Sequence, residues 1–580
     1  MTIPKLQFDF RLNQEAELHP IIFTDPIEII MTYQIDEIKP SLAKVEAAIN
    51  NGHYVAGYMN YEASYAFYHT NQTIESDIPL LWFGVFNEPN ATPEIPNLNN
   101  NFTVGTWAMQ ESKQIYSNNV REILQLIQDG HTEQVNYTVP FHASFHGDPY
   151  PYYEQLKRAQ QANFNAFLQL EDLAILSVSP EKFFSIKDNT VSVKPMKGTV
   201  KRGMSSKKDM EQFRWLQQSE KDKVENDLIT ELMKDELERI ADNIIIANRY
   251  EIETYPTVYQ MTSTIHGDLK KEVHPVHVLR TLFPCGSITG VPKQKTVDII
   301  ATKEKANRGV YCGAIGYFTP NHEAIFNVAI RTVTINQKKQ LAQYHAGGGI
   351  TRSSTVDKEF EELIAKTDVL NKTLPTFSLL ETFLLEDGTI FLKENHFSRL
   401  QCSAKYFNYN VNVANLNDII TDLQQTYSKG AWRIRLLLNK SGDITPEIFP
   451  LQKSAHSTVR LAKQPIDQNN VYLYHKTTER SMFDPHRDLL QENDLDILLW
   501  NQNGEITEFT IGNVVVEKEG KLITPPVECG LLPGTFREQL LKDEVIIEEK
   551  IFLDDLDELS SIWLINSVRK WVKVSLQKES

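Results

Sequence analysis

VSVKPMKGT, residues 191 to 199, joins a strand-like run to a lysine, Lys197, that directly precedes a glycine. A second strand-like run, LAILSVS, lies at 173 to 179, and a helical pattern is expected over 209 to 246. Strands that alternate with helices predict an α/β fold for this half of the chain. An isolated lysine before Gly-Thr is most often a surface residue, so its role depends on the segments around it.

Those segments are spread over residues 127 to 366. In chain order they are DGHTEQVNYT (129–138), SPEKFF (179–184), PMKGT (195–199), KDKVENDLITELM (221–233), VYQMTST (258–264), FPCGSITGVPK (283–293), RGVYCGAIGY (308–317), IRTVTI (330–335) and HAGGGITRSS (345–354). Together they resemble the chorismate-utilising enzyme family, which includes anthranilate synthase, isochorismate and salicylate synthases and aminodeoxychorismate synthase. The resemblance implies an α/β (α+β) sandwich of antiparallel sheets with helices.

Two positions discriminate among members of that family. Anthranilate synthases resemble this chain at residue 197 but carry alanine there, so that ammonia adds directly to the ring. A lysine can instead attack C2 of chorismate and expel the C4 hydroxyl, after which ammonia enters at C4 and the enolpyruvyl group is retained. Family members that add water carry a lysine at position 134, whereas the neutral Gln134 suits ammonia, which needs no deprotonation. Both residues favour the chemistry of an aminodeoxychorismate synthase component I.

The nucleophile and its acid need displaced pKa values. Lys197 must be a free amine, so the site must lower its pKa from about 10.4 by burial or by positive charge, to which bound magnesium would contribute. The resemblance implies that Glu181 protonates the departing hydroxyl, which requires a raised pKa. A role as an N-cap-like acid after Ser-Pro stays open for Glu181.

Chorismate carries two carboxylates, and the resemblance implies a site for each. Mg²⁺ takes oxygen ligands, and two carboxylate pairs are spaced three apart on expected helices, the first beside an apolar stripe that begins at Val224. Such pairs usually lie on a solvated face; the family register implies Glu225 and Glu362 as ligands, with Asp222 and Glu359 behind them. For the rest of the substrate it implies Ser287, Tyr311, Arg331, Gly347, Gly348 and Gly349. The chain departs from the family at Gln260, where a histidine is common.

A second set of segments begins at residue 377. It comprises FSLLETF (377–383), NHFSRL (395–400), YHKTTERSMFD (474–484), GEITEFTIGNVVVEKEGKLITPP (504–526), CGLLPGTFREQLL (529–541) and NSVR (566–569). These segments resemble the fold-type IV pyridoxal 5'-phosphate (PLP) enzymes, which include branched-chain and D-amino-acid aminotransferases and aminodeoxychorismate lyase.

That resemblance assigns roles to seven residues. Lys476 would bond to the cofactor aldehyde and later move the substrate proton, and Glu508 would pair with the protonated pyridine nitrogen. Taken singly, Lys476 would be an exposed lysine and Glu508 an acid at a strand edge. The phosphate would be held by Arg399 and by the backbone N–H groups of Thr535 and Phe536, with Asn566 and Ser567 nearby.

The two halves make chemical sense together. An amine formed at ring carbon C4 beside a retained enolpyruvyl ether is what PLP needs to eliminate pyruvate and leave 4-aminobenzoate, a folate precursor. The predicted domains are 1–126, the N-terminal part of the synthase; 127–370, the chorismate-binding region; 371–376, a linker; and 377–580, the PLP-dependent lyase. Two alternatives stay open: an anthranilate-synthase-like enzyme fused to a D-amino-acid or branched-chain aminotransferase-like domain, and a synthase whose second half serves only for docking or regulation.

Composition limits the partners. The 580 residues include 59 basic and 76 acidic side chains, a net charge of −17 that disfavours binding to nucleic acid or anionic membranes. MTIPKLQFDFRL (1–12) lacks a signal-peptide core and no apolar run approaches ~18 residues, so we expect a cytoplasmic protein. None of the four scattered cysteines lies in a nucleophile elbow of the amidotransferase type, so ammonia is expected from a separate glutamine amidotransferase subunit. A homodimer through the PLP half stays open.

Overall fold

The computed structural model describes residues 3–11, 20–68, 75–90, 101–372, 374–452 and 456–577. It forms two compact units, Met1–Lys201 with Phe213–Leu374, and Arg202–Gln212 with Pro375–Ser580. The linker predicted at 371 to 376 stays a prediction; its residue 373 lies outside the described residues, as do 1–2, 12–19, 69–74 and 91–100 of the predicted N-terminal part.

Unit 1 contains two antiparallel sheets, each ten-stranded within the described residues. The first sheet has the order β16 (Gly290–Val291), β8 (Gln134–Gly147), β20 (Leu341–Thr351), β19 (Thr332–Asn336), β10 (Leu173–Ser179), β9 (Phe164–Gln169), β1 (Lys5–Phe10), β2 (Ile21–Thr24), with β6 (Phe102–Val104) and β7 (Ala108–Met109) beside β8. The second has the order β13 (Met196–Lys201), β15 (Val258–Leu269), β12 (Thr190–Val193), β11 (Lys182–Lys187), β18 (Ala324–Val328), β17 (Ala314–Phe318), β4 (Tyr54–Met59), β5 (Leu81–Phe86), β3 (Glu28–Thr32), with β14 (Ala241–Thr254) beside β15.

Side chains from both sheets share one core, which makes unit 1 a sandwich. Phe8 of β1 packs edge-on against Tyr317 of β17, with ring centroids 5.3 Å apart, inside a cluster of buried residues drawn from both sheets. The predicted antiparallel sandwich is therefore confirmed. The helices are α1 (Ile38–Asn50), α2 (Tyr65–Tyr68), α3 (Lys113–Gln128), α4 (Pro149–Gln160), α5 (Ser206–Gln218), α6 (Glu220–Leu237), α7 (Pro275–Leu282), α8 (Lys293–Lys303) and α9 (Val356–Ala365).

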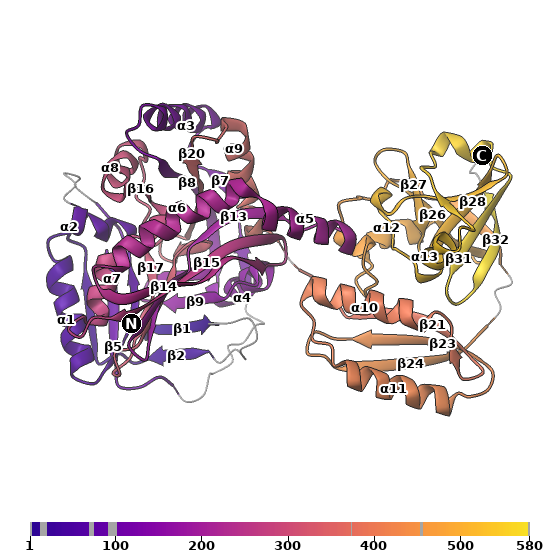
Figure 1. Ribbon diagram of the computed structural model, residues 1–580, viewed down its shortest axis with the longest axis horizontal. Coiled ribbons are helices and arrows are strands. Elements are labelled where there is room, and N and C mark those ends of the chain that lie inside the picture. Colours follow the sequence, from indigo (N-terminus) through magenta and orange to yellow (C-terminus); the bar gives the residue numbers. More distant parts are fainter. Residues whose placement is uncertain are drawn as a thin grey trace. The chain divides into compact units, whose positions relative to one another are not determined.

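Two helices carry the carboxylates predicted for magnesium, Asp222 and Glu225 on α6 and Glu359 and Glu362 on α9. α6 lies along β13 and β15, and α9 lies along β20 (Figure 1). The strand predicted at 173 to 179 is β10, whereas the run at 191 to 196 is divided into β12 and β13 around Pro195, which cannot donate to a ladder. The helix predicted over 209 to 246 is two helices, α5 and α6, which are divided at Ser219, the N-cap of α6. The prediction is wrong at 241 to 246, because these residues form part of β14. Their isoleucines, Ile244 to Ile246, favour a strand.

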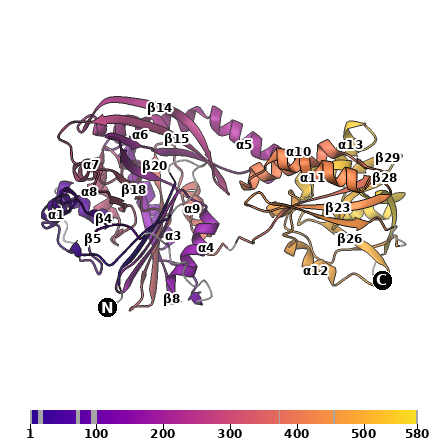
Figure 2. The same cartoon turned by 90° about the horizontal axis from the view of Figure 1, so that it is seen from below.

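Unit 2 has a small sheet and a larger one. The small sheet has the order β22 (Thr389–Ile390), β21 (Leu379–Glu386), β23 (Ala431–Leu438), β24 (Ile444–Pro450), and α10 (Lys393–Phe407) and α11 (Val413–Thr426) cover one of its faces (Figure 2). The larger, mixed sheet has the order β27 (Ile506–Phe509), β26 (Asp494–Trp500), β25 (Thr458–Leu461), β32 (Lys570–Gln577), β31 (Ser561–Asn566), β28 (Gly512–Lys518), β29 (Lys521–Thr524), β30 (Ile547–Glu548). Short helices α12 (Asp484–Arg487) and α13 (Thr535–Lys542) complete the unit.

Residues 202 to 212 pack into unit 2 although their neighbours in sequence belong to unit 1. Arg202 is buried, forms a two-pronged ion pair with Asp209 at 2.5 Å, and lies 4.2 Å over the ring of Tyr406 on α10. Tyr406 in turn contacts His475, with ring centroids 4.3 Å apart. The segment therefore contacts Tyr406, which packs against His475, the residue that directly precedes Lys476 in the chain.

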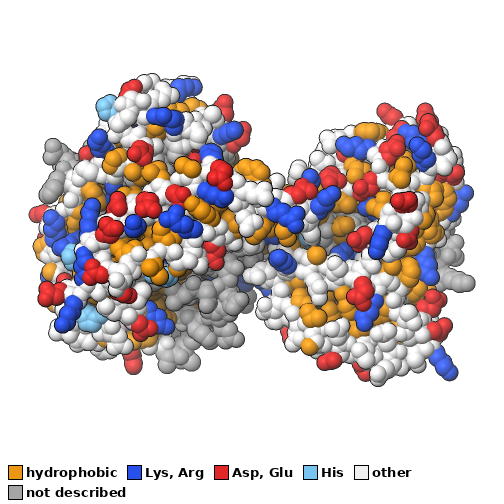
Figure 3. Space-filling model, in the orientation of Figure 1, with side chains coloured by type: hydrophobic (Ala, Val, Ile, Leu, Met, Phe, Trp, Pro, Cys, Tyr) orange, Lys and Arg blue, Asp and Glu red, His pale blue; other side chains and the backbone are white. Residues whose placement is uncertain are grey.

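The described surface carries mixed charge. On the face shown in Figure 3, basic side chains are interspersed with acidic ones and do not gather into a single basic patch. This distribution is in line with the net charge of −17. Among the described residues, no helix is both long and apolar enough to cross a membrane.

Candidate active sites

Lys197 lies at a β-bulge on β13. The pairing with β15 shifts between Met196 and Thr199, and Gly198 between them has a φ of +90°. A Cβ at residue 198 would lie 2.9 Å from the Cβ of Asp222 on α6, so both the backbone and the close contact require glycine. A bulge turns the side chain beside it away from the regular strand alternation.

Lys197 meets Gln134 at the glycine run of β20. A Cβ built on Gly349 would lie 2.9 Å from both the Nζ of Lys197 and the Nε2 of Gln134. Gln134 is fully buried, and neither its Oε1 nor its Nε2 has a hydrogen-bond partner among the described residues. A buried amide without partners costs about 1–3 kcal/mol per unmet group. The arrangement therefore suits a small polar ligand that hydrogen-bonds to the Gln134 amide and the Lys197 amine.

Glu181 and Ser287 form another part of this site. Ser287 Oγ donates to Glu181 Oε1 at 2.6 Å. Burial raises the pKa of Glu181 to about 7, although the hydrogen bond from Ser287 and the charge of Lys197 both oppose the shift. The pKa of Lys197 is lowered, chiefly by burial of its amine. A carboxyl with a raised pKa thus lies near an amine with a lowered pKa, the pairing that acid and nucleophile roles need.

Lys366, which the sequence analysis did not single out, is part of the same site. Its Nζ donates to Glu362 Oε1 at 2.6 Å and to the carbonyl of Gly347 at 2.7 Å. The charge of Glu225 raises the pKa of Lys197, and the charge of Lys366 lowers it. The positive neighbour expected for Lys197 is therefore supplied in part by the chain itself. The spacing of four residues from Glu362 was the available sequence signal.

The four carboxylates predicted for magnesium lie around Lys197 but do not assemble a metal site. A Cβ on Gly348 would lie 3.0 Å from Glu359 Oε2 and 3.6 Å from Glu362 Oε1, and Asp222 lies against Gly198. Among the described residues no three His, Cys, Asp or Glu side chains come close enough together to hold a metal. The oxygen donors suit Mg²⁺, yet the Lys366 ammonium occupies Glu362, so the magnesium site stays a prediction.

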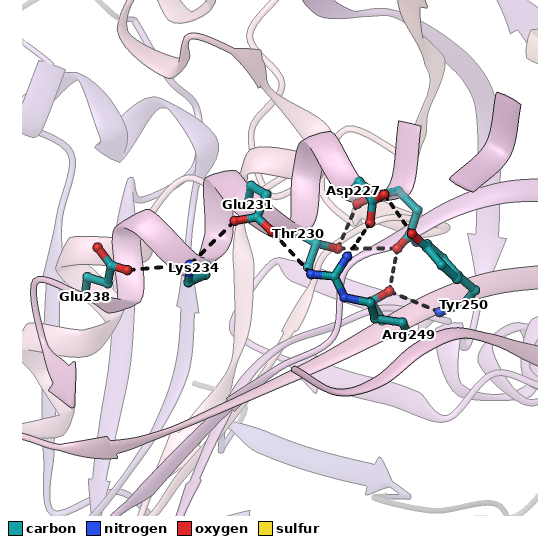
Figure 4. Close-up of polar contacts among 9 residues, drawn as sticks. Asp227, Thr230, Glu231, Lys234, Glu238, Arg249 and Tyr250 are labelled. Carbon is teal, nitrogen blue, oxygen red and sulfur yellow. Dashed lines mark hydrogen bonds and ion pairs between the residues drawn. The ribbon is translucent and has the colours of Figure 1, made fainter. Parts of the chain in front are cut away.

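Helix α6, which carries Asp222 and Glu225, is held in place by polar contacts. Arg249 on β14 reaches Asp227 at 3.0 Å, and Tyr250 Oη donates to Asp227 at 2.7 Å (Figure 4). Asn226, which is buried, accepts from Ser263 of β15 at 2.5 Å. The apolar stripe predicted to begin at Val224 is wrong at that residue, which is 67% exposed, because α6 turns the polar Asn226 towards the sheet instead.

Of the residues predicted for the second carboxylate, Arg331 lies near the end of α9. Arg331, with a φ of +51°, donates through Nη1 to the carbonyl of Lys366 at 2.7 Å. Tyr311 stacks on His345, with centroids 5.3 Å apart. Gly347 to Gly349 of β20 pair with β8 on one side. On the other side of β20, the pairing with β19 ends at Tyr344, so the three glycines are not paired with β19. Gln260 accepts from Thr199 Oγ1 at 2.7 Å, beside the strand of Lys197.

In unit 2, Lys476 and Glu508 share one site. Burial lowers the pKa of Lys476 to about 8, and the Arg399 charge lowers it further. Burial raises the pKa of Glu508 to about 8, against a backbone hydrogen bond and the charges of Arg480 and Lys476. A carboxyl in this state would be stabilised as a carboxylate by a cationic partner such as a protonated pyridine nitrogen. The two residues therefore fit PLP.

Two residues missed in the sequence analysis, Asn513 and Glu381, position Glu508 and Arg399 respectively. Asn513 Nδ2 donates to Glu508 Oε2 at 3.2 Å and to the carbonyl of Leu532 at 2.8 Å. Glu381 accepts two hydrogen bonds from Arg399, at 2.9 and 2.7 Å, and Arg399 also donates to the carbonyl of Pro533 at 3.1 Å. Burial alone would raise the pKa of Glu381, but the charges of Arg399 and His396 outweigh it and hold that pKa at about 2.

Arg399 thereby lies at the start of α13, whose first residues are Thr535 and Phe536. No side chain caps this helix, so its first N–H groups stay available for a phosphate. Ser567 Oγ donates to the carbonyl of Thr382 at 3.2 Å, and Asn566 Oδ1 accepts from the Arg569 N–H at 2.7 Å. Every residue predicted for the cofactor thus belongs to unit 2, although Asn566 bonds within its own turn and Ser567 bonds to Thr382 of β21.

Comparisons with known proteins agree with this division. Residues 9–372 match the family of chorismate binding enzymes, and residues 378–576 match class IV amino-transferases. Aminodeoxychorismate synthase component 1 of Salmonella typhimurium is 35% identical over 264 residues, and anthranilate synthase component 1 of Saccharolobus solfataricus is 31% identical over 275. These matches cover 45% and 47% of this chain and 58% and 65% of those proteins, so the chain spans less than two thirds of either relative.

Solved structures extend the comparison to the fold. Anthranilate synthase component I from Streptococcus pneumoniae superposes with a TM-score of 0.52 at 21% identity, covering 63% of this chain and 90% of that one. It shares the fold of unit 1. The chain belongs to the family of chorismate binding enzymes and carries a class IV amino-transferase domain after it.

Proposed function

We propose that the chain makes 4-aminobenzoate in two steps, amination of chorismate to 4-amino-4-deoxychorismate and elimination of pyruvate from that product. The observation that carries the first step is the meeting of the Lys197 amine with the unpartnered Gln134 amide at Gly349. The second step rests on the coexistence of Lys476 and Glu508 in a class IV amino-transferase domain. The relatives that are aminodeoxychorismate synthases support the first step.

In the first step Lys197 Nζ bonds to C2, the ring double bonds shift, and the C4 hydroxyl leaves as water with a proton from Glu181. A pKa of about 7 keeps much of Glu181 protonated at neutral pH. Ammonia, held by Gln134, then bonds to C4 while Lys197 leaves C2. The net change is chorismate plus ammonia to the amine plus water, with the enolpyruvyl ether intact.

In the second step bound PLP would draw electrons from the C4 position of the attached amine. Lys476, with a pKa of about 8, is suited to take the C4 proton near neutral pH. Glu508 would hold the cofactor ring in its protonated state, and Arg399 with the start of α13 would hold its phosphate. Loss of the C4 proton and of pyruvate from the neighbouring carbon leaves an aromatic ring.

Three finer points belong to this proposal. Magnesium would be held by Glu225 and Glu362, with Asp222 and Glu359 behind them, once Lys366 releases Glu362. Ammonia would come from a glutamine amidotransferase subunit. The protein would work in the cytoplasm. An anthranilate-type amination fused to an amino-acid aminotransferase is the competing function; relatives at similar identity include an anthranilate synthase, so product identity must decide.

The test uses two full-length variants, Lys197→Ala and Lys476→Ala. Each is supplied with chorismate, ammonium, Mg²⁺ and PLP, alone and mixed with the other. We expect neither variant to make 4-aminobenzoate alone, the Lys476 variant to accumulate 4-amino-4-deoxychorismate, and the mixture to restore 4-aminobenzoate. Formation of 4-aminobenzoate by the Lys476 variant alone, or of anthranilate by the wild type, would overturn the proposal.

A further inference from the structure

Residues 202 to 212 are held inside unit 2 by a buried ion pair. Arg202 Nε and Nη2 donate to the two carboxylate oxygens of Asp209, each at 2.5 Å, and both side chains are less than 10% exposed. The Gly203 N–H also donates to Asp209, at 3.1 Å. A Cβ at residue 203 would lie 2.2 Å from the Asp209 nitrogen, so this turn has room only for glycine. The turn thus holds the Arg202 guanidinium in one orientation.

The Arg202 guanidinium lies against Tyr406 in the last turn of α10. It is 4.2 Å from the centroid of the Tyr406 ring, and its Nη1 donates to the Tyr406 carbonyl at 3.4 Å. Both residues are buried. A guanidinium over an aromatic ring is attracted by the electrons of the ring face, and the attraction is stronger where water is excluded. Arg202 therefore contacts both the ring and the backbone of Tyr406.

Tyr406 forms one wall around the ring of His475. His475 is 2% exposed, and its ring centroid lies 4.3 Å from that of Tyr406 and 4.9 Å from that of Phe407. Ser403, one turn earlier on α10, hydrogen-bonds to His475 Nδ1 at 3.0 Å. Burial lowers the pKa of His475 to about 3, and the charge of Arg202 adds to the shift. The imidazole is therefore neutral near pH 7 and is fixed by contacts with α10.

Lys476 follows His475 directly, and its backbone is also bonded to β21. The Leu380 N–H donates to the Lys476 carbonyl at 2.9 Å, and Thr477 forms a bridge with Leu379. The backbone of Lys476 thus has two supports, the bonds to β21 and the packing of His475 against α10. A misplacement of about 1 Å that starts far from the chemistry can slow a reaction by about 10²-fold.

We propose that Arg202 is a positioning residue for Lys476 in the lyase reaction. It holds Tyr406 against His475, and His475 fixes the backbone from which the Lys476 side chain extends. The inference rests on the function proposed for the second step. A stretch of chain that begins five residues after Lys197 would therefore serve the chemistry of unit 2.

The kinetic test compares full-length Arg202→Ala and Arg202→Lys with the wild type, with 4-amino-4-deoxychorismate as substrate. The control is Lys207→Ala, which removes a positive charge from an exposed residue of the same segment. We expect Arg202→Ala to lower kcat roughly 10- to 100-fold and to leave KM near its wild-type value, because the groups that bind the substrate are unchanged. Arg202→Lys keeps the charge but loses the two-pronged geometry, so it should recover part of the rate. Lys207→Ala should match the wild type.

Two further readouts separate positioning from a general loss of stability. In the PLP-free protein, the amide of Leu380, which bonds to the Lys476 carbonyl, should exchange its hydrogen faster in Arg202→Ala, while the amides of β31 keep their wild-type rates. The second readout is a double-mutant cycle with Ser403→Ala, which acts on the same imidazole from α10. The losses in kcat should be non-additive, because both changes displace His475.

The outcomes distinguish this role from the proposed function. Unchanged kcat and unchanged exchange at Leu380 in Arg202→Ala, while the wild type makes 4-aminobenzoate, would overturn the positioning role and leave the proposed function standing. Faster exchange throughout unit 2 with additive losses in kcat would also overturn it, because Arg202 would then act on stability alone. If Arg202→Ala does not fold, Arg202→Lys is measured in the same ways and judged by the same outcomes. A wild type that releases no pyruvate from 4-amino-4-deoxychorismate, while exchange at Leu380 still depends on Arg202, would overturn the proposed function instead.

Discussion

Replacing Ser287 with alanine tests whether Glu181 is the acid of the first step. Ser287 Oγ donates to Glu181 Oε1 at 2.6 Å, and Glu181 is only 4% exposed. The bond stabilises the carboxylate, so its loss should raise the pKa of Glu181 further. A hydrogen bond to a charged group is worth about 1.5–3 kcal/mol, which corresponds to about one to two pKa units. From a value of about 7, the pKa should rise to roughly 8 or 9.

The direction of the shift in the pH profile follows from the role of Glu181 as an acid. Glu181 acts while protonated, so kcat/KM for amination should fall above its pKa, and the falling limb should move to higher pH in Ser287→Ala. The assay is the initial rate of 4-amino-4-deoxychorismate formation at several pH values, with the concentration of unprotonated ammonia held constant. Ser287→Cys, whose thiol is a weaker donor, should give an intermediate shift, and Glu181→Gln should abolish most activity.

Two results would refute this reasoning. A falling limb at the same pH in the wild type and in Ser287→Ala would show that Glu181 does not set it. A Glu181→Gln variant that retains both its rate and the limb would remove Glu181 from the chemistry altogether.

Four further predictions concern the same unit. Lys197→Ala should lose the aminated product that retains pyruvate, with some diversion to anthranilate; mass spectrometry of the products decides, and unchanged output would exclude the covalent route. Lys366→Gln should raise the pKa of Lys197, because it removes a positive charge and frees Glu362, so the rising limb of the pH profile should move to higher pH; a limb that stays in place contradicts this. Gly349→Ala should slow amination by roughly 10²-fold, because its Cβ would lie 2.9 Å from two nitrogens, while lyase activity on added 4-amino-4-deoxychorismate stays intact as the internal control. The pure protein should use ammonium but not glutamine, and glutamine turnover without a second subunit would be the contrary result.

Several residues that the structure brings close together could be named from the sequence, because these residues lie in recognisable segments. Lys197, Gln134, Glu181 and Ser287 come from four separate segments, and the structure brings them together through a bulge and a glycine contact. Lys366 was not foreseen, since a lysine after an acidic helix is usually a solvated residue and only packing against the glycine run gives it a role.

Other features depend on long-range contacts that no local pattern encodes. Glu381 lies in a strand and acts through Arg399 on α10, and Asn513 acts through Glu508 across a hairpin. The predicted helix from 209 to 246 was wrong at 241 to 246 because charged residues on both sides obscured a short run of isoleucines that pairs with β15.

The passage of residues 202 to 212 through unit 2 means that the chain crosses between its two compact units three times, after Lys201, after Gln212 and after Leu374. A gene cut at the linker would produce a second protein without eleven residues of its own unit, among them Arg202, which covers Tyr406 beside His475. The halves are therefore interlaced in sequence as well as joined end to end, and an ancestor with two separate proteins would have needed another way to cover that surface.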